Sequence, residues 1–554
     1  MAAFRDPDAN AGLASAFERA RDSSRNVVLI GFKRQGNLGL GYLSATLEAA
    51  GYGVEVVDFE DPPAVVLEAV RRLDPILVGF SLIFQFHVHR FEALARYLRE
   101  GGVASHFTVG GHFPSLSSAE TLRLMPQLDS VVVFEGELTL LELVDALGMG
   151  HPWRDIDGLV HRVGGEVVQN SPRALLPDLD ELPFPHRTVD TRMILGRTSA
   201  QLIASRGCAR TCSFCSIHMF YRLAPGKVVR TRRPSEVARE MRLLHDERGA
   251  TLFLFQDDDF PIFGPAWHRW CRELLEEMDR QDLIGRMLWK INCRADAVDP
   301  VLLAEMRDAG LYLVYMGLES GSDEGLRTLH KQTTVAQNIR AVETLKELDI
   351  LFDFGFMMLD PSSSFESIAD NVAFLRRIVG DGYAAAEFCR MIPYDGTPIK
   401  DELEQQGRLR GDVCNPDYDL LDPRLEIFFR QIDEALKLTG WIHGLEALSP
   451  NLKFAVGEYA VMERLTPELP GLADYRGAIK QITKESNEVL FGVVEELADA
   501  ARRGVRASLS QDDLARDSRA FLERLLDERN AFVVRNEQAL VDALRLPPVE
   551  AAVA

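Results

Sequence analysis

The run Arg206-Gly-Cys-Ala-Arg-Thr-Cys-Ser-Phe-Cys215 carries three cysteines, Cys208, Cys212 and Cys215, at spacings of four and three residues. Thiolates spaced in this way along one short loop can each bind a different iron of a four-iron, four-sulfur cluster. The fourth iron then has no cysteine ligand, and its open coordination can hold a small chelating molecule. The loop is therefore predicted to hold a 4Fe-4S cluster.

A zinc site or a set of structural thiols would also account for three cysteines. Zinc usually takes four ligands in paired spacings, whereas the remaining cysteines of this chain are scattered singly. Those cysteines are expected to be small core residues. They are Cys271, Cys293, Cys389 and Cys414.

Length and composition indicate a large enzyme of a reducing compartment. A chain of 554 residues is too long for one hydrophobic core and suggests about three domains. Its seven cysteines lack the regular spacing of a disulfide scaffold, so a cytoplasmic location is expected. Residues 1–25 are charged throughout and lack the apolar core of a secretory signal.

Two classes of partner are not expected. No window approaches eighteen apolar residues free of charge, so no membrane span is predicted. The net charge of −22 would repel phosphate backbones, which argues against nucleic acid as a substrate.

Residues 26–147 alternate apolar, strand-like runs with helix-like segments. Apolar strands separated by helical periods are typical of a parallel sheet covered on both faces. The pattern predicts an α/β, Rossmann-like, doubly wound domain over residues 26–150, after an N-terminal extension of residues 1–25. The expected strands lie within residues 26–32, 53–60, 75–84, 106–115 and 129–137.

Residues 151–198 are predicted to be a hairpin and linker. The run from Ile156 to Asn170 is expected to form a hairpin that turns at Gly164 and Gly165. Three prolines between residues 176 and 186 argue against a helix in the remainder.

From residue 199 to 400 the alternation returns, and polar residues follow several strands. The apolar run that begins at Leu252 ends in three aspartates. Strand alternation places Asp257 and Asp259 on one side and Asp258 on the other. Carboxylates at a strand end are suited to binding a cationic ligand group.

The cysteine loop, the strand-end motifs after it and the Rossmann-like domain before it resemble cobalamin-dependent radical SAM enzymes, in particular class B methyltransferase-like members. The resemblance extends from residue 26 to about residue 400. It implies an N-terminal Rossmann-like cobalamin-binding domain, a partial (β/α)6 TIM-like radical SAM barrel over residues 199–400 and a mostly helical C-terminal domain over residues 401–554. The cofactors are expected at the C-terminal face of the barrel.

The resemblance assigns the cysteine loop to a 4Fe-4S cluster that binds S-adenosylmethionine (SAM). At the turn after the sixth barrel strand, Asp360-Pro-Ser-Ser-Ser replaces the glycine-containing turn of the family, which puts the backbone contacts to adenosine in doubt. The implied contacts of SAM are Phe214 near the adenine, Asp257 or Asp259 near the amino group, Arg294 at the carboxylate, and Gly317, Glu319 and Ser320 at the methionyl end or ribose.

The resemblance also assigns cobalamin to the loops that follow the first strands. The sequence signature whose histidine ligates cobalt in other cobalamin domains is absent from residues 26–150, so cobalamin is expected without a histidine ligand, in its base-off form. The implied cobalamin contacts are Gln35, Ser81, Gln85, Gly110, Gly111, His112, Glu135 and Gly136.

The activity implied is C-methylation, in which one SAM methylates cobalamin and a second yields the 5′-deoxyadenosyl radical that abstracts a substrate hydrogen. A cobalamin-binding radical SAM cyclase or ring-rearranging enzyme is an alternative that no motif excludes. A non-catalytic corrinoid carrier or sensor would need the first domain but not the cysteine loop. A methylthiotransferase would need a second cluster, and residues 1–207 contain no cysteine.

The expected partners are a small-molecule or peptide substrate and a low-potential electron donor such as flavodoxin. No motif in the C-terminal region identifies the substrate. Trp441, Phe454 and Tyr459 would either line a substrate pocket there or fill a helical core.

Overall fold

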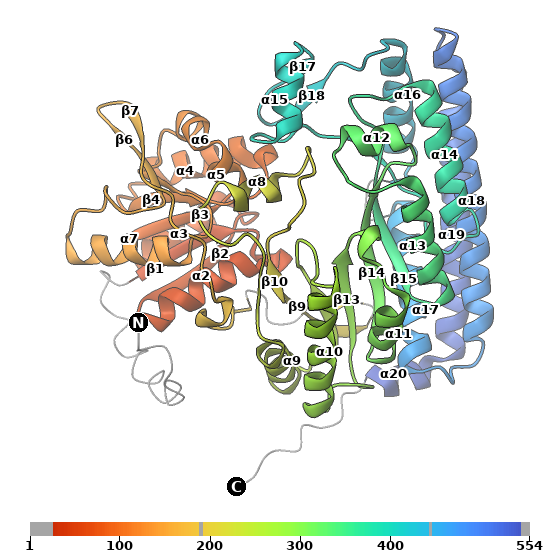
Figure 1. Cartoon of the computed structure of the whole chain (residues 1–554), viewed down its shortest axis with the longest axis horizontal. Coiled ribbons are helices and arrows are strands. Elements are labelled where there is room, and N and C mark those ends of the chain that lie inside the picture. Colours follow the sequence, from red (N-terminus) through yellow and green to blue (C-terminus); the bar gives the residue numbers. More distant parts are fainter. Residues whose placement is uncertain (1–25, 188–191, 195, 443–445, 545–554) are drawn as a thin grey trace. The chain divides into compact units, whose positions relative to one another are not determined.

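The computed structural model describes residues 26–187, 192–194, 196–442 and 446–544 and divides them between two units (Figure 1). Unit 1 contains the described residues within 1–190, 205–236 and 393–417. Unit 2 contains those within 191–204, 237–392 and 418–554. The cysteine loop therefore belongs to the same unit as the N-terminal sheet.

Unit 1 is built on a seven-stranded sheet. Its strands are β1 (Asn26–Gly31), β2 (Gly53–Asp58), β3 (Leu77–Ser81), β4 (His106–Gly110), β5 (Ser130–Val132), β6 (Leu159–Val163) and β7 (Glu166–Gln169), in the order β2-β1-β3-β4-β5-β6-β7. Strands β1 to β5 are parallel, and their order is that of a doubly wound, flavodoxin-like sheet. The predicted Rossmann-like fold is confirmed.

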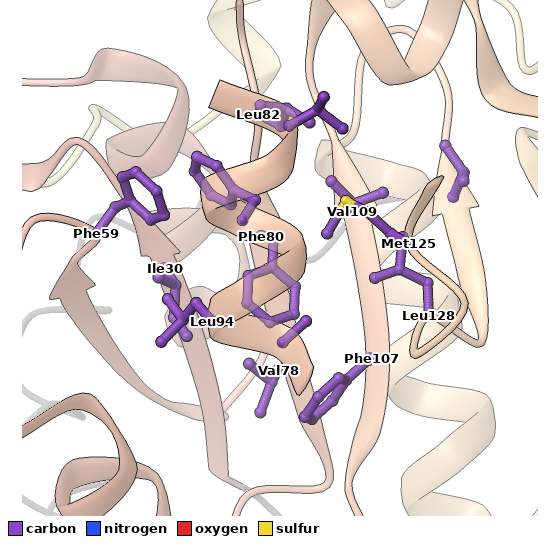
Figure 2. Packing of buried hydrophobic residues seen from close by; sticks show 14 of the residues in the cluster. Ile30, Phe59, Val78, Phe80, Leu82, Leu94, Phe107, Val109, Met125 and Leu128 are labelled. Atoms are coloured by element: carbon purple, nitrogen blue, oxygen red, sulfur yellow. The ribbon is translucent and has the colours of Figure 1, made fainter. Parts of the chain in front are cut away.

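Helices cover both faces of this sheet because its strands are apolar on both sides. They are α2 (Leu38–Ala49), α3 (Pro63–Leu73), α4 (Val88–Glu100), α5 (His112–Leu116), α6 (Ser118–Leu124) and α7 (Glu137–Met149). Helices α2 and α7 pack on Val27 and Leu29. Figure 2 shows the core of the other face, where Phe80 lies near Leu94 of α4. Full burial of such a side chain stabilises the fold by about 1.5–3 kcal/mol.

The predicted hairpin forms, with its turn at Gly164 and Gly165, but it is part of the first sheet. Strand β6 pairs antiparallel with β5, opposing Ser130 to His161, and β7 pairs antiparallel with β6. The pairing with β5 extends the sheet by two strands. The hairpin therefore forms the edge of the first sheet and is not a free connector.

Gly111, directly after β4, is held in a conformation that only glycine adopts cheaply. Its φ is 122°, and a Cβ there would lie 2.3 Å from the carbonyl oxygen of Leu82. We expect Gly111→Ala to destabilise unit 1 by roughly 2 kcal/mol or more, because backbone strain adds to the clash. Urea unfolding would measure this loss. Gly102→Ala is the matched control, since Gly102 also has a positive φ, 83°, but nothing lies within 4 Å of its Cβ position; a Gly111→Ala loss no larger than that of Gly102→Ala would contradict the prediction.

Unit 2 contains the half-barrel. Its strands are β8 (Arg192–Ile194), β9 (Arg197–Leu202), β12 (Leu252–Phe255), β13 (Leu288–Cys293), β14 (Leu311–Glu319), β15 (Leu351–Leu359) and β16 (Cys389–Arg390), in the order β16-β15-β14-β13-β12-β9-β8. Six of them are parallel, and β8 pairs antiparallel with β9. The crossover helices are α9 (Pro234–Arg248, which starts in unit 1), α10 (Pro265–Arg280), α11 (Pro300–Asp308), α12 (Asp323–Thr328), α13 (Val335–Glu347) and α14 (Phe365–Val379). The predicted partial (β/α)6 barrel is confirmed.

The C-terminal region of unit 2 is helical, as predicted. Its helices are α16 (Arg424–Leu438), α17 (Leu448–Leu465), α18 (Leu472–Arg502), α19 (Gln511–Arg535) and α20 (Glu537–Leu544). Trp441 and Tyr459 are buried, whereas Phe454 is 43% exposed beside Arg529. Two of the three aromatic residues considered for a pocket are thus core residues.

The remaining helices and strands of unit 1 lie outside its seven-stranded sheet and the helices that cover that sheet. They are β10 (Ser205–Arg206), α8 (Ser216–Arg222), β11 (Arg230–Thr231), α15 (Pro398–Gln405), β17 (Leu409–Gly411) and β18 (Pro416–Tyr418, whose last residue falls in unit 2). None of the helices in the described ranges is both long and apolar enough to cross a bilayer.

Candidate functional site

The cysteine loop of unit 1 is closed at its base by a short antiparallel pair. Strand β10 pairs with β11, opposing Arg206 to Arg230. Within the loop, the amide of Cys215 donates to the carbonyl of Cys212 at 3.2 Å, and Cys215 directly precedes α8. Cys212 is buried, and Cys208, Cys215 and the neighbouring Phe214 are half-buried. The loop thus gathers three thiols, none of them in a disulfide, within eight residues.

These thiols fit a cluster in their chemistry. Among the described residues, no three His, Cys, Asp or Glu side chains meet closely enough to hold one metal ion. Each cysteine of an iron–sulfur cluster binds its own iron, so its thiolates need not converge on one point. Three soft thiolates and no carboxylate or imidazole are a donor set suited to iron and sulfide.

A buried ion network ties the cysteine loop to the N-terminal sheet. Glu135, which follows β5, accepts from Arg206 at 3.2 Å and from Arg230 at 2.8 Å, and Arg206 also donates to Glu137 at 2.6 Å. The side chain of Arg230 is 1% exposed and that of Glu135 is 10% exposed. Burial alone would raise the pKa of Glu135, but the two guanidinium groups outweigh it and lower that pKa. Glu135 therefore positions the cysteine loop. The sequence had suggested only a contact with cobalamin for this residue.

Gln85, another expected cobalamin contact, is likewise engaged within unit 1. Its Nε2 donates to Asp395 at 3.1 Å and to the carbonyl of Val413 at 2.7 Å, and its Oε1 accepts from the amide of Asp395 at 2.8 Å. The side chain is 2% exposed. Gln85 thus anchors the segment 393–417 beside the sheet.

The remaining expected cobalamin contacts lie near the carboxyl ends of the strands. Ser81 and Gly110 are paired in register at the ends of β3 and β4, and Gln35 lies exposed in the turn after β1. In this strand order the topological switch point lies between β1 and β3, where doubly wound sheets bind their ligands. A ligand of this sheet is therefore expected at this edge.

Three further residues of that edge have local structural roles. His112 packs on Phe220 of α8, with ring centroids 4.6 Å apart, and burial lowers its pKa to about 4, so the imidazole is neutral at pH 7. Gly136 precedes α7 and would make only ordinary contacts through a Cβ. Gly111 is required by the backbone of Leu82.

In unit 2, the aspartates after β12 alternate as the sequence predicts. Asp257 is buried, Asp258 is exposed and Asp259 is half-buried. Both carboxylate oxygens of Asp257 lie 3.1 Å from the amide of Ala204 at the end of β9. Asp257 therefore joins the ends of two neighbouring strands.

Arg294, expected at the SAM carboxylate, has internal partners. Its Nε donates to Asp296 at 2.9 Å, and its Nη2 donates to the carbonyl of Lys331. The side chain is 7% exposed. Its positive charge is thus compensated by Asp296.

The end of β14 carries a strained, buried ion pair. Glu319 has a φ of 62° and accepts from Nζ of Lys331 at 2.8 Å. A Cβ on Gly317 would lie 2.2 Å from Oε1 of Glu319 and 2.7 Å from Nζ of Lys331, so only glycine leaves room for this pair. Ser320 is fully buried, and its hydroxyl accepts from the amide of Ser322 at 3.1 Å.

Several partners of these residues could not be predicted from the sequence. Lys331, Arg230 and Asn371, which binds the amide of Gly321 at 2.7 Å, carry no recognisable motif. Their roles depend on contacts between separate segments. Arg206 is different, because it lies in the same short run as the three cysteines.

Two domain families match the chain. Residues 33–144 match the B12 binding domain, and residues 202–375 match the radical SAM superfamily. An uncharacterized methyltransferase of Pyrococcus horikoshii is 28% identical over 375 residues, which cover 65% of this chain and 77% of that protein. The anaerobic magnesium-protoporphyrin IX monomethyl ester cyclase of Cereibacter sphaeroides is 26% identical over 381 residues, which cover 66% of this chain and 60% of the cyclase.

The fold recurs in a solved structure. The cobalamin-dependent S-adenosylmethionine radical enzyme OxsB with aqua-cobalamin bound aligns with a TM-score of 0.66 at 16% identity, over 96% of this chain and 84% of that chain. At that identity the likeness concerns the fold alone. The two domain matches, in this order, are those of cobalamin-dependent radical SAM enzymes: the chain carries a B12 binding domain followed by a radical SAM domain.

Proposed function

We propose that this enzyme is a C-methyltransferase that delivers a cobalamin-borne methyl group to a carbon radical of its substrate. The observation that carries the proposal is that the cysteine loop and the Rossmann-like sheet share unit 1, joined through Glu135 to Arg206 and Arg230. Methyl transfer to a short-lived radical requires reacting groups held at a fixed separation. A buried ion network is suited to that task. A methyltransferase among the relatives supports the assignment.

The residues divide between the two cofactors. Cys208, Cys212 and Cys215 would hold the cluster and leave one iron open to SAM, with Phe214 beside the adenine. When bound, the cluster with SAM supplies a 5′-deoxyadenosyl radical and cobalamin supplies the methyl group. The residues proposed to hold cobalamin are Gln35, Ser81, Gly110 and the backbone of Gly111, while Gln85, His112, Glu135 and Gly136 would shape and support that edge.

In unit 2, the strand-end polar residues are proposed to hold SAM. Glu319, fixed by Lys331, would accept from hydroxyl or ammonium groups of SAM, and the carboxylates of Asp257 and Asp259 would favour the ammonium group. Arg294 would act through the turn it binds, because Asp296 and the carbonyl of Lys331 already take its donors.

Gly317→Ala tests the role of the Glu319–Lys331 pair. The new methyl group would displace two flexible side-chain ends, so the fold is expected to persist while the ion pair moves. We expect SAM cleavage to fall about tenfold or more, which corresponds to about 1.4 kcal/mol in the barrier. The measurement is 5′-deoxyadenosine formation, with Gly492→Ala as the control because nothing lies within 4 Å of its Cβ position. Unchanged SAM cleavage in Gly317→Ala would show that the Glu319–Lys331 pair is not part of the SAM site.

We also propose an electron donor and a cellular compartment for this enzyme. A low-potential donor such as flavodoxin would reduce the cluster, whose potential requires it. A reducing compartment would keep the seven cysteines as thiols, and we propose the cytoplasm.

A cyclase is the second candidate function, because a magnesium-protoporphyrin ester cyclase is 26% identical to this chain. The chain covers 60% of that relative, so the name does not decide the reaction. The two candidates differ in the fate of the methyl group of SAM.

Product analysis distinguishes them. The reconstituted enzyme is incubated without oxygen with SAM, hydroxocobalamin and titanium(III) citrate, and the nucleosides and corrinoids are identified by mass spectrometry. We expect S-adenosylhomocysteine and methylcobalamin together with 5′-deoxyadenosine. Formation of 5′-deoxyadenosine alone would favour the cyclase, and formation of neither nucleoside would indicate a corrinoid carrier.

A further inference from the structure

Three neighbouring strands of unit 2 present polar residues on the inner face of the half-barrel. In β14, Val314 and Met316 are fully buried, whereas Tyr315 between them is 37% exposed. Tyr315 is paired in register with Asp353 of β15 on one side and with Asn292 of β13 on the other. Lys290 precedes Asn292 by two residues and therefore shares its face. We call Lys290, Tyr315 and Asp353 the inner-face cluster.

The inner face is open beside Tyr315. Strand β14 is flanked by β13 and β15, so the exposure of Tyr315 arises on the face of the sheet and not at its edge. Gly355 lies against the tyrosine, because a Cβ there would be 2.8 Å from its hydroxyl. Gly355 is paired in register with Gly317, so two adjacent positions lack side chains. A substrate group can therefore reach the tyrosine hydroxyl.

The carboxylates near the inner-face cluster pair with Lys453, whereas Asp353 and Asp257 act on Lys290 only from beyond ion-pair distance. Lys453 of α17 contacts Asp353 at 3.0 Å and also pairs with Glu387, so its ammonium group offsets one of these two negative charges. Nζ of Lys290 lies 5.7 Å from the ring centroid of Tyr315. Within the described ranges, no carboxylate oxygen lies within 4.0 Å of that ammonium group.

An apolar layer lies below Lys290. Leu254 and Leu313 flank Lys290 in register. They pack against a cluster formed by Leu252, Leu288, Tyr312 and Val461, the last from α17. A half-buried ammonium above such a layer has lost part of its hydration, and burial lowers the pKa of Lys290. A bound anion would replace the lost hydration with a charge-assisted hydrogen bond.

We propose that Lys290 and Tyr315 bind an anionic group of the substrate, a carboxylate or a phosphoryl group. The ammonium and the phenolic hydroxyl offer donors from adjacent strands to one oxyanion. Lys453 holds Asp353 and Glu387 and weakens their repulsion of that anion by offsetting one of their two negative charges. The inference rests on the proposed function, since it takes the ligand of the inner face to be the substrate of the radical reaction.

Probe binding tests this site on the reconstituted holoenzyme. Benzoate and phenylphosphonate supply the two anions on one apolar ring, and benzylamine and benzamide supply cationic and neutral matches. Ligand-observed NMR is expected to detect binding of at least one of the two anions and no binding of benzylamine or benzamide. Binding of benzoate alone would identify a carboxylate site, and binding of phenylphosphonate alone a phosphoryl site.

Substitutions assign that binding to the cluster. Lys290→Met is expected to weaken anion binding roughly tenfold to a hundredfold, as for loss of a hydrogen bond to a charged group. Tyr315→Phe, which removes one oxygen, is expected to weaken it by a smaller factor, and it serves if Lys290→Met does not fold. Lys437→Met is the control, because Lys437 is an exposed lysine of α16 paired with Asp433. Equal anion binding by wild type and both cluster variants, tighter binding of benzylamine, or no anion binding by the wild type would overturn the proposal.

The same samples separate this inference from the proposed function. Binding is measured without turnover, and methylcobalamin formation is measured afterwards in the same tube. Lys290-dependent anion binding without methylcobalamin would reject the methyltransferase and keep the anion site. Methylcobalamin formation with Lys290-independent binding would reject the anion site and keep the methyltransferase.

Discussion

Replacing Cys212 with alanine is expected to abolish SAM cleavage. Cys212 is the middle and most buried of the three loop cysteines. With only two protein thiolates, two irons of the cluster would have no protein ligand. Such a cluster would not be bound stably enough to be reduced. After anaerobic reconstitution, the variant is expected to contain little iron and sulfide and to form 5′-deoxyadenosine only at background level. Cys208→Ala and Cys215→Ala are expected to behave alike.

Cys271→Ala is the matched control for these variants. Cys271 is 1% exposed, and its thiol donates to the carbonyl of Pro261 at 3.1 Å in unit 2. Its loss would cost about 1 kcal/mol of stability through a small cavity and a weak hydrogen bond. The control should therefore keep its iron and its cleavage activity. Retained SAM cleavage in Cys212→Ala would show that this loop does not hold the cluster.

Glu135→Ala is expected to have the second large effect, on stability and on the spacing of the cofactors. It would leave the guanidinium group of Arg230, 1% exposed, without its carboxylate and would take one of two carboxylates from Arg206. Removing one partner of a buried ion pair typically costs about 3–5 kcal/mol. For a unit of this size that lowers the unfolding midpoint by about 10 °C. Differential scanning calorimetry would measure the shift.

The pH dependence of stability separates the charge of Glu135 from its packing. Because the pKa of Glu135 in the folded state lies below the ordinary glutamate value of 4.5, Glu135 contributes stability that is present above pH 4.5 and is lost as the pH falls toward the folded-state pKa. Glu135→Gln should flatten that part of the profile. Glu55→Ala removes an exposed partner of Arg72 and should cost no more than about 0.5 kcal/mol. A Glu135→Ala loss of the same size would show that the network does not anchor the loop.

The fold could be predicted from the sequence because its signals are local. Apolar runs such as residues 26–32 and 252–255, separated by helical periods, report parallel strands without knowledge of their neighbours. The hairpin turn at Gly164 was readable for the same reason. Its membership in the first sheet was not, since that depends on the pairing of Ser130 with His161.

The site residues could be predicted only where they lie together in one short stretch of the sequence. The spacing of Cys208, Cys212 and Cys215 is such a run. Glu135 meets Arg206 across 71 residues and Gln85 meets Asp395 across 310, and no local pattern reports such contacts. Residues expected to touch cobalamin, Gln85 and Glu135, therefore proved to have internal partners that sequence spacing did not indicate.

Electron paramagnetic resonance of the reduced holoenzyme tests most directly the claim that one chain holds both cofactors. Protein reconstituted with iron, sulfide and hydroxocobalamin is reduced without oxygen, and spectra are recorded before and after SAM is added. We predict a reduced 4Fe-4S signal that changes with SAM, and a cob(II)alamin signal without the nitrogen splitting of an axial imidazole. A cluster signal that ignores SAM, or the absence of either signal, would contradict the account.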